Sequence, residues 1–143
     1  MRRFLIIGLD TFGRCVACEL REAGFDVTVV DHKPSGIQDV VDKLDTVSRT
    51  DFICPETLHR IGVNEFDVVI LGFTGNFDLS TVIIPLLKRL GVRFLVATAS
   101  TEEEAVTLKR LGADWVIVPE REAGYYLAEY LIDGVHWRLT SVR

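Results

Sequence analysis

Short apolar segments of strand length alternate with segments of helix length along nearly the whole chain. The first pair is the clearest: the apolar run RFLIIG precedes FGRCVACELREAG, whose apolar residues recur at helical spacing up to Gly24. The full alternation predicts six βα units. Such repeats indicate a parallel sheet with helices on both faces, and right-handed crossovers favour the strand order 3-2-1-4-5-6. We therefore predict an α/β fold, a Rossmann-like doubly wound parallel sheet of six strands.

The other five units follow from the same pattern. We expect strands at residues 26–31, 45–51, 67–73, 92–99 and 114–119, and helices at residues 35–44, 55–62, 77–91, 101–112 and 120–132. The predicted domain organisation is one Rossmann-like lobe, residues 1–133, followed at residues 134–143 by a C-terminal tail or a linker to a partner region.

Three local signals refine the helices. Pro85 lies inside a predicted helix and removes a backbone hydrogen bond, so we expect a kink near residues 81–85. Thr101 and Glu104 have capping-box spacing, and Ser100 and Glu103 offer the same spacing one residue earlier. The acidic run at residues 102–104 is therefore interpreted as a helix start and not as a metal site.

Bulk composition excludes several classes of function. The 143 residues are 48% hydrophobic, which suits a sheet buried on both faces, and the net charge of −5 offers no general attraction for nucleic acid. No apolar run approaches the ~20 residues of a membrane span, so we expect a cytoplasmic protein without membrane insertion. Three cysteines argue against a disulfide framework, and we place Cys15 and Cys18 on a helix surface.

The predicted topology places a ligand crevice beyond the first and fourth strands, where the strand order reverses. Two Gly-containing loops meet there, Gly8–Gly13 and Gly72–Phe77, and each opens a helix. Two helix N-termini at one crevice favour an anion. In the first loop, Gly8 permits the tight turn and Gly13 permits close packing of helix on strand, as in the Gly-x-Gly-x-x-Gly pattern.

Asp10 stands where that pattern has its middle glycine. A carboxylate beside a diphosphate is unfavourable unless a cation or a tilt of the side chain separates them. Asp31, at the end of the second strand, has the spacing of a carboxylate that binds ribose hydroxyls. His32 and Lys33 follow it, either at the crevice rim, where Lys33 would offset charge, or as an ordinary solvated loop.

No catalytic set is evident. The chain has no supported Ser-His-Asp or Cys-His arrangement and no Walker-type lysine motif, and a dehydrogenase would need a substrate domain as well. Asp51 follows the third strand, where an adenine ring would lie, although a turn or cap before Pro55 explains it equally. We predict that the protein is not an enzyme and has no metal site.

The segment FLIIGLDTFGRCVACELREAGFDVTVVD resembles the start of an RCK domain, also called TrkA-N. FDVVIL, STVIIPLLKRLGV and LKRLGADWVIVPEREAGYYLAEYLI extend the resemblance from Arg3 to about Ile132. Members of this family are cytosolic regulatory subunits and gating domains of Trk/Ktr potassium transporters and potassium channels. The resemblance implies a homo-oligomer, a dimer or a higher ring, that binds NAD(H), ATP or ADP and acts on a membrane pore subunit.

The resemblance also assigns roles to residues: phosphates at the first loop, ribose at Asp31 and adenine near Asp51. The candidate cofactor-binding residues are Gly8, Asp10, Thr11, Phe12, Gly13, Asp31, His32, Lys33, Asp51, Phe52, Gly72, Thr74 and Asn76. Two of them depart from the family pattern, Asp10 from glycine and Phe52 from alanine. Some members bind a divalent cation through a glutamate equivalent to Glu120, which is interpreted here as a helix-start acid.

Three hypotheses about function follow. The first is a nucleotide-sensing regulatory subunit or domain of a potassium transporter or channel, at the cytosolic face of the plasma membrane. The second is an assembly module of the same family that has lost nucleotide binding through Asp10 and Phe52 and therefore has no cofactor. The third, ranked last, is a fragment of an NAD-dependent oxidoreductase.

Overall fold

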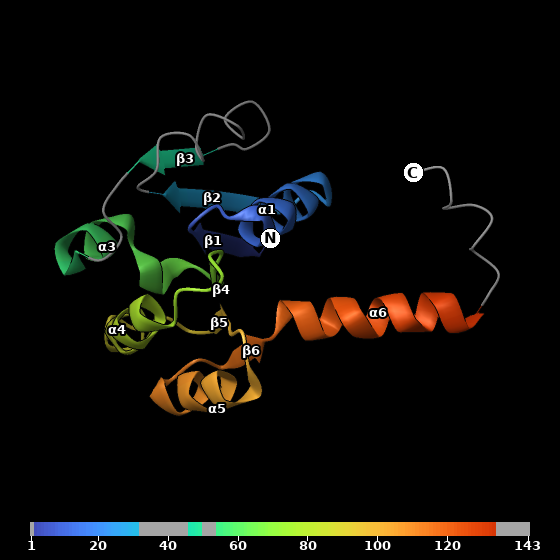
Figure 1. Cartoon of the computed structure of the whole chain (residues 1–143). Helices are drawn as coiled ribbons and strands as arrows, with labels where there is room; N and C mark the ends of the chain where they lie inside the picture. Colours follow the sequence, from blue (N-terminus) through green and yellow to red (C-terminus); the bar gives the residue numbers. More distant parts are fainter. Residues whose placement is uncertain (1, 32–45, 50–53, 134–143) are drawn as a thin grey trace.

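A six-stranded parallel sheet forms the centre of the molecule, in the order β3-β2-β1-β4-β5-β6 (Figure 1). The computed structural model describes residues 2–31, 46–49 and 54–133. The strands are β1 (Arg3–Ile7), β2 (Asp26–Asp31), β3 (Thr46–Arg49), β4 (Val68–Leu71), β5 (Leu95–Thr98) and β6 (Trp115–Ile117). The predicted fold class, strand number and strand order are confirmed.

Five α-helices are described, together with a short 3-10 helix, η1 (Val63–Glu65). They are α1 (Thr11–Glu22), α3 (Pro55–Ile61), α4 (Phe77–Arg89), α5 (Glu102–Leu111) and α6 (Pro119–Asp133). The helix expected at residues 35–44 and the tail at residues 134–143 lie outside the described residues. None of the helices in the described ranges combines the length and apolarity that a membrane span needs.

The central strands β1, β2, β4 and β5 contribute to two separate cores, one on each face of the sheet. In β1, Leu5 and Ile7 pack with residues of α3, α4 and α5, whereas Phe4 and Ile6 pack on the opposite face with residues of α1. The same alternation continues in β4 and β5. Both faces of a strand are therefore apolar, which explains why the strands form unbroken hydrophobic runs in the sequence.

The helix boundaries reflect specific capping contacts. At the start of α5, the Thr101 hydroxyl accepts a hydrogen bond from the Glu104 amide at 3.2 Å, as predicted. The Glu104 carboxylate accepts one from the Ser100 amide at 2.9 Å, so the reciprocal bond falls one residue before the cap. Helix α4 continues through Pro85, and the kink remains a prediction. Cys15 is exposed and Cys18 half-buried, and both are free thiols.

Three glycines allow the turn after β1 to contact the end of β4. Gly8 has a φ of +91°, which only glycine adopts readily. A Cβ atom on Gly13 would lie 2.6 Å from both the Gly8 and Gly72 carbonyl oxygens, and one on Gly72 would lie 2.2 Å from the Gly8 carbonyl oxygen. The backbones are thus in direct contact, and no side chain fits between them.

Helix α6 leaves the body of the domain, as Figure 1 shows in orange, and none of its residues is buried. Its first turn is nevertheless fixed. Arg121 forms ion pairs with Glu102 at the start of α5 and with Glu122, and the Glu122 amide donates to the Val118 carbonyl oxygen at 3.1 Å. These contacts anchor the N-terminal end of the helix to the domain.

We expect Gly72→Ala to lower the free energy of unfolding by about 3 kcal/mol, because its Cβ atom would clash with rigid backbone. Urea denaturation measures the change. Gly124→Ala is the matched control: Gly124 lies in α6, and a Cβ atom there would meet nothing within 4 Å, so alanine should be neutral or stabilise by up to ~1 kcal/mol. Equal effects of the two variants would contradict the packing role of Gly72.

Candidate functional site

The candidate crevice lies where β1 and β4 run side by side in the sheet and their loops leave the same edge. Ile7 pairs with Leu71 at the last position of both strands, so the Gly8–Gly13 loop and the Gly72–Phe77 loop begin next to each other. Each loop leads into a helix, α1 or α4. This is the point at which the strand order reverses, as the sequence predicted.

Asp10 connects the two loops. Its backbone occupies the N-cap position of α1, yet its side chain makes no capping hydrogen bond to that helix. Instead, Asp10 Oδ2 accepts a hydrogen bond from the Thr74 amide at 3.1 Å, and the Asp10 amide donates to the Gly72 carbonyl oxygen at 3.1 Å. The carboxylate is therefore turned toward the β4–α4 loop and leaves the first-turn amides of α1 without a side-chain cap.

Asp31 is buried, with 3% of its surface exposed, at the carboxyl end of β2. Its Oδ2 atom accepts a hydrogen bond from the Leu9 amide at 3.0 Å. The next amide back along the chain, that of Gly8, donates to the Val30 carbonyl oxygen at 2.8 Å. Asp31 thus holds the turn after β1 against the end of β2. Its contact with a ribose remains a prediction.

The structure brings together the two glycine-containing loops and gives several of their residues a structural role. Gly8, Gly13 and Gly72 pack against one another, and the Asn76 side chain caps α4 by accepting from the Leu79 amide at 3.2 Å. Thr11 and Thr74 are exposed. His32, Lys33, Asp51 and Phe52 lie outside the described residues.

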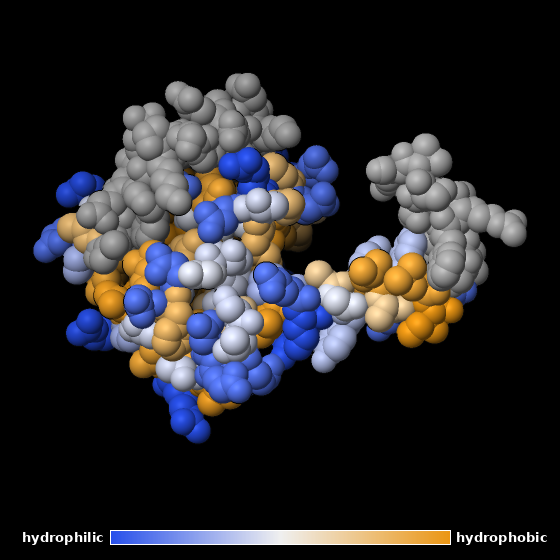
Figure 2. Space-filling view, in the orientation of Figure 1, coloured by the Kyte–Doolittle hydropathy of each residue, from blue (hydrophilic) through white to orange (hydrophobic). Residues whose placement is uncertain are grey.

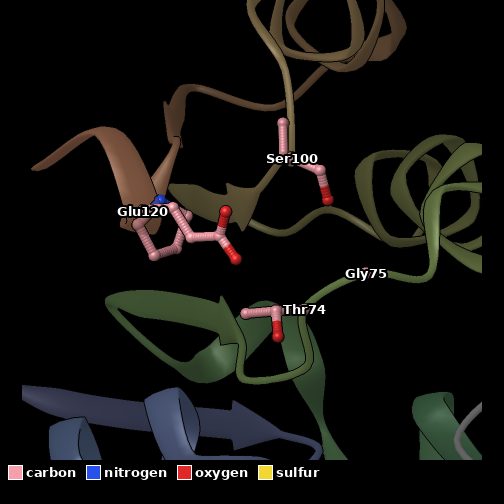
Figure 3. A pocket seen from close by; sticks show the side chains of 6 residues that line it. Thr74, Gly75, Ser100 and Glu120 are labelled. Carbon is pink, nitrogen blue, oxygen red and sulfur yellow. The ribbon is translucent and has the colours of Figure 1, made fainter. Parts of the chain in front are cut away.

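A small cavity of about 130 Å³ lies next to the candidate crevice, on the side of the Gly72–Phe77 loop. It lies beyond the carboxyl ends of β4, β5 and β6 and is lined by Thr74, Gly75, Ala99, Ser100, Pro119 and Glu120. In Figure 3 the Glu120 carboxylate extends into the space between Ser100 and Thr74. The volume is below the ~300 Å³ at which ligand pockets usually begin, so the cavity has room for only part of a nucleotide.

Sequence reasoning missed Ser100 as a lining residue and considered Glu120 only for a cation. A signal was available, because Ser100 and Glu120 lie within three residues of the carboxyl ends of β5 and β6, which share one edge of the sheet with β4. The Thr98 hydroxyl reinforces this edge by donating to the Phe73 carbonyl oxygen at 2.8 Å inside the protein. Within the described ranges, no group of three or more His, Cys, Asp or Glu residues is arranged to hold a metal ion.

The sequence model of the TrkA-N domain family matches residues 4–119. Among curated proteins, the Ktr system potassium uptake protein A of Vibrio alginolyticus is 26% identical over 132 residues, which cover 92% of this chain and 60% of that protein. Another relative, an uncharacterized protein of Mycoplasma pneumoniae, is 30% identical over 139 residues, covering 97% of this chain and 60% of that protein. The chain therefore spans about 60% of the length of these relatives.

Solved structures share the fold. The NAD(P)-binding domain of an exopolyphosphatase-related protein from Archaeoglobus fulgidus superposes with a TM-score of 0.82 at 15% identity, covering 93% of this chain and 99% of that domain. The GsuK channel bound to NAD gives a TM-score of 0.75 at 17% identity, covering 88% of this chain and 23% of the channel. At these identities the likeness establishes the fold alone.

We expect Asp31→Ala to lower the free energy of unfolding by about 1 to 3 kcal/mol, because the buried Leu9 amide would lose its acceptor. Asp26→Ala is the control on the same strand: its ion pair with Arg3 is about 40% exposed on both sides, so the loss should stay below ~1 kcal/mol. Chemical denaturation of both variants gives the comparison. If the Asp31 variant were as stable as the Asp26 variant, the role of Asp31 in holding the turn after β1 would be contradicted.

Proposed function

The chain belongs to the TrkA-N domain family, and on that basis we propose that it is a nucleotide-sensing regulatory subunit or domain of a potassium transport system. The observation that carries the proposal is the family match over residues 4–119, which includes both loops of the crevice. The Ktr relative from Vibrio alginolyticus is named for potassium uptake. We propose a regulatory role and not a catalytic one, because the name of that relative refers to potassium uptake and to no chemical reaction.

The proposed ligand is an adenine nucleotide, NAD(H) or ATP/ADP. Support comes from the open first turn of α1, whose amides receive no side-chain cap from Asp10, because uncapped amides at a helix N-terminus favour a phosphate. Solved structures of the GsuK channel, a fold neighbour, hold NAD in one case and ADP in another. Asp31 lies at the end of β2, where a carboxylate meets a ribose in this topology.

The proposed partners are a membrane potassium transporter or channel subunit and further copies of this chain, at the cytosolic face of the plasma membrane. Helix α6 carries the argument for assembly. Ala123, Tyr126, Leu127, Tyr130 and Leu131 recur every three or four residues and therefore share one side of the helix. Tyr126 is 68% exposed, Leu127 56% and Leu131 46%, and Figure 2 shows apolar residues gathered on the outer part of this helix.

The sheet offers a surface that complements this helix. Trp115 and Ile117 alternate along β6, and Ile117 packs in the core on the α1 face, so Trp115 belongs to the same face. Trp115 is nevertheless 57% exposed, because α6 extends away from the sheet. We propose that α6 of a second copy covers this face, in a two-fold arrangement where each copy supplies one helix and one surface.

Calorimetric titration tests the sensing role. We expect at least one of NAD, NADH, ATP and ADP to release heat on binding, with and without Mg²⁺ in parallel runs. Inorganic pyrophosphate is the matched control, because it offers the anion without the nucleoside. An absence of heat with all four nucleotides would overturn nucleotide sensing and favour the assembly module. Turnover of a nicotinamide cofactor with any substrate would instead favour the oxidoreductase.

Light scattering after size exclusion tests the assembly. We expect a dimer or larger species at micromolar concentration, and a monomer for the double variant Leu127→Asp/Leu131→Asp, because two carboxylates would interrupt the apolar side of α6. Val106→Asp is the control, since Val106 is 45% exposed on α5, outside the proposed contact. A monomeric parent chain would overturn the proposed dimer, and so would dissociation of the Val106 variant alone.

A further inference from the structure

Asp10 already supplies an anion to the crevice. Its Oδ2 atom accepts from the Thr74 amide at 3.1 Å, although an aspartate at an N-cap usually bonds to the first turn of its own helix. Its backbone amide donates to the Gly72 carbonyl oxygen at 3.1 Å. One residue of the first loop is thus bonded through side chain and backbone to the second loop, and this link needs no ligand.

The carboxylate also lies beside the place where a phosphate would sit. Asp10 directly precedes α1, and a phosphate held by the first-turn amides of that helix would be adjacent to it. On the other side of Thr74, the cavity is lined by a second carboxylate, Glu120, and by no basic side chain of the described residues. Each additional negative charge on a phosphate therefore raises the repulsion in the crevice.

Adenine nucleotides differ in the charge they bring to this position. In a dinucleotide such as NAD, both phosphates are internal diesters and carry one negative charge each. The terminal phosphate of ADP or ATP carries up to a second charge near neutral pH, like any phosphate monoester. A fixed carboxylate next to the phosphates consequently penalises ADP and ATP more strongly than NAD(H).

We propose that Asp10 is a specificity-determining residue, which makes the crevice select NAD(H) over ADP and ATP. This inference rests on the proposed function, because it concerns the ligand of the same crevice. The exposed Asp10–Thr74 bond fixes the carboxylate in place and so keeps its charge next to the phosphate position.

Affinities for NAD and ADP, measured by calorimetry without divalent cations, test the proposal in three proteins. Asp10→Asn retains an acceptor for the Thr74 amide but removes the charge, and Asp10→Gly removes both. In both variants we expect ADP to gain about tenfold in affinity relative to NAD. Added salt should reduce the difference between parent and variants in the ratio of ADP affinity to NAD affinity, because salt screens charge. A purely structural role of Asp10 would not produce this salt dependence.

Glu22→Gln is the matched control, because Glu22 is an exposed acid at the last position of α1, at the opposite end of that helix from Asp10. It should leave the ratio of the two affinities unchanged. An unchanged ratio in Asp10→Asn, with both nucleotides still bound, overturns the inference and leaves the proposed function standing. Binding by Asp10→Gly but not by the parent overturns both the selection of NAD(H) and sensing in the native chain. No binding by any of the proteins overturns both.

Discussion

The contact between the backbones of Gly8, Gly13 and Gly72 is the constraint on which the rest of the structure depends. It joins the turn after β1 to the end of β4, two segments that are neighbours in the sheet but far apart in the sequence. Because β1 is central and pairs with both β2 and β4, its turn fixes where α1 begins and where the second loop passes. A side chain at Gly13 or Gly72 would push these backbones apart, whereas one at Gly8 would meet the Phe73 side chain.

Around that contact, three polar side chains of the crevice are already hydrogen-bonded to backbone amides of the protein. Asp31 accepts from the Leu9 amide, Asp10 from the Thr74 amide, and Asn76 from the Leu79 amide. Buried or strained turns require such partners, since an unpaired amide is costly. The crevice is therefore shaped before any ligand arrives, and preorganised loops lower the ordering cost of binding.

Much of this architecture could be predicted from the sequence, because hydrophobic periodicity reports directly on which faces are buried. The six strands and their order followed from that pattern, and the packing role of Gly13 followed from the loop motif. The direction of the Asp10 side chain could not be predicted, since its partner lies 64 residues away. The packing role of Gly72 was missed for the same reason. Helix α6 was expected as a helix, but nothing local shows that it leaves the domain.

The anchoring of α6 has a mechanical consequence. Its 15 residues extend about 22 Å, and its first turn is tied to the domain by Arg121 to Glu102 and by the Glu122 amide to Val118. That same first turn supplies Pro119 and Glu120 to the wall of the cavity. The start of α6 is therefore both its attachment to the domain and part of the cavity wall. A rotation of a few degrees about Pro119 would move the far end of the helix by an ångström or more.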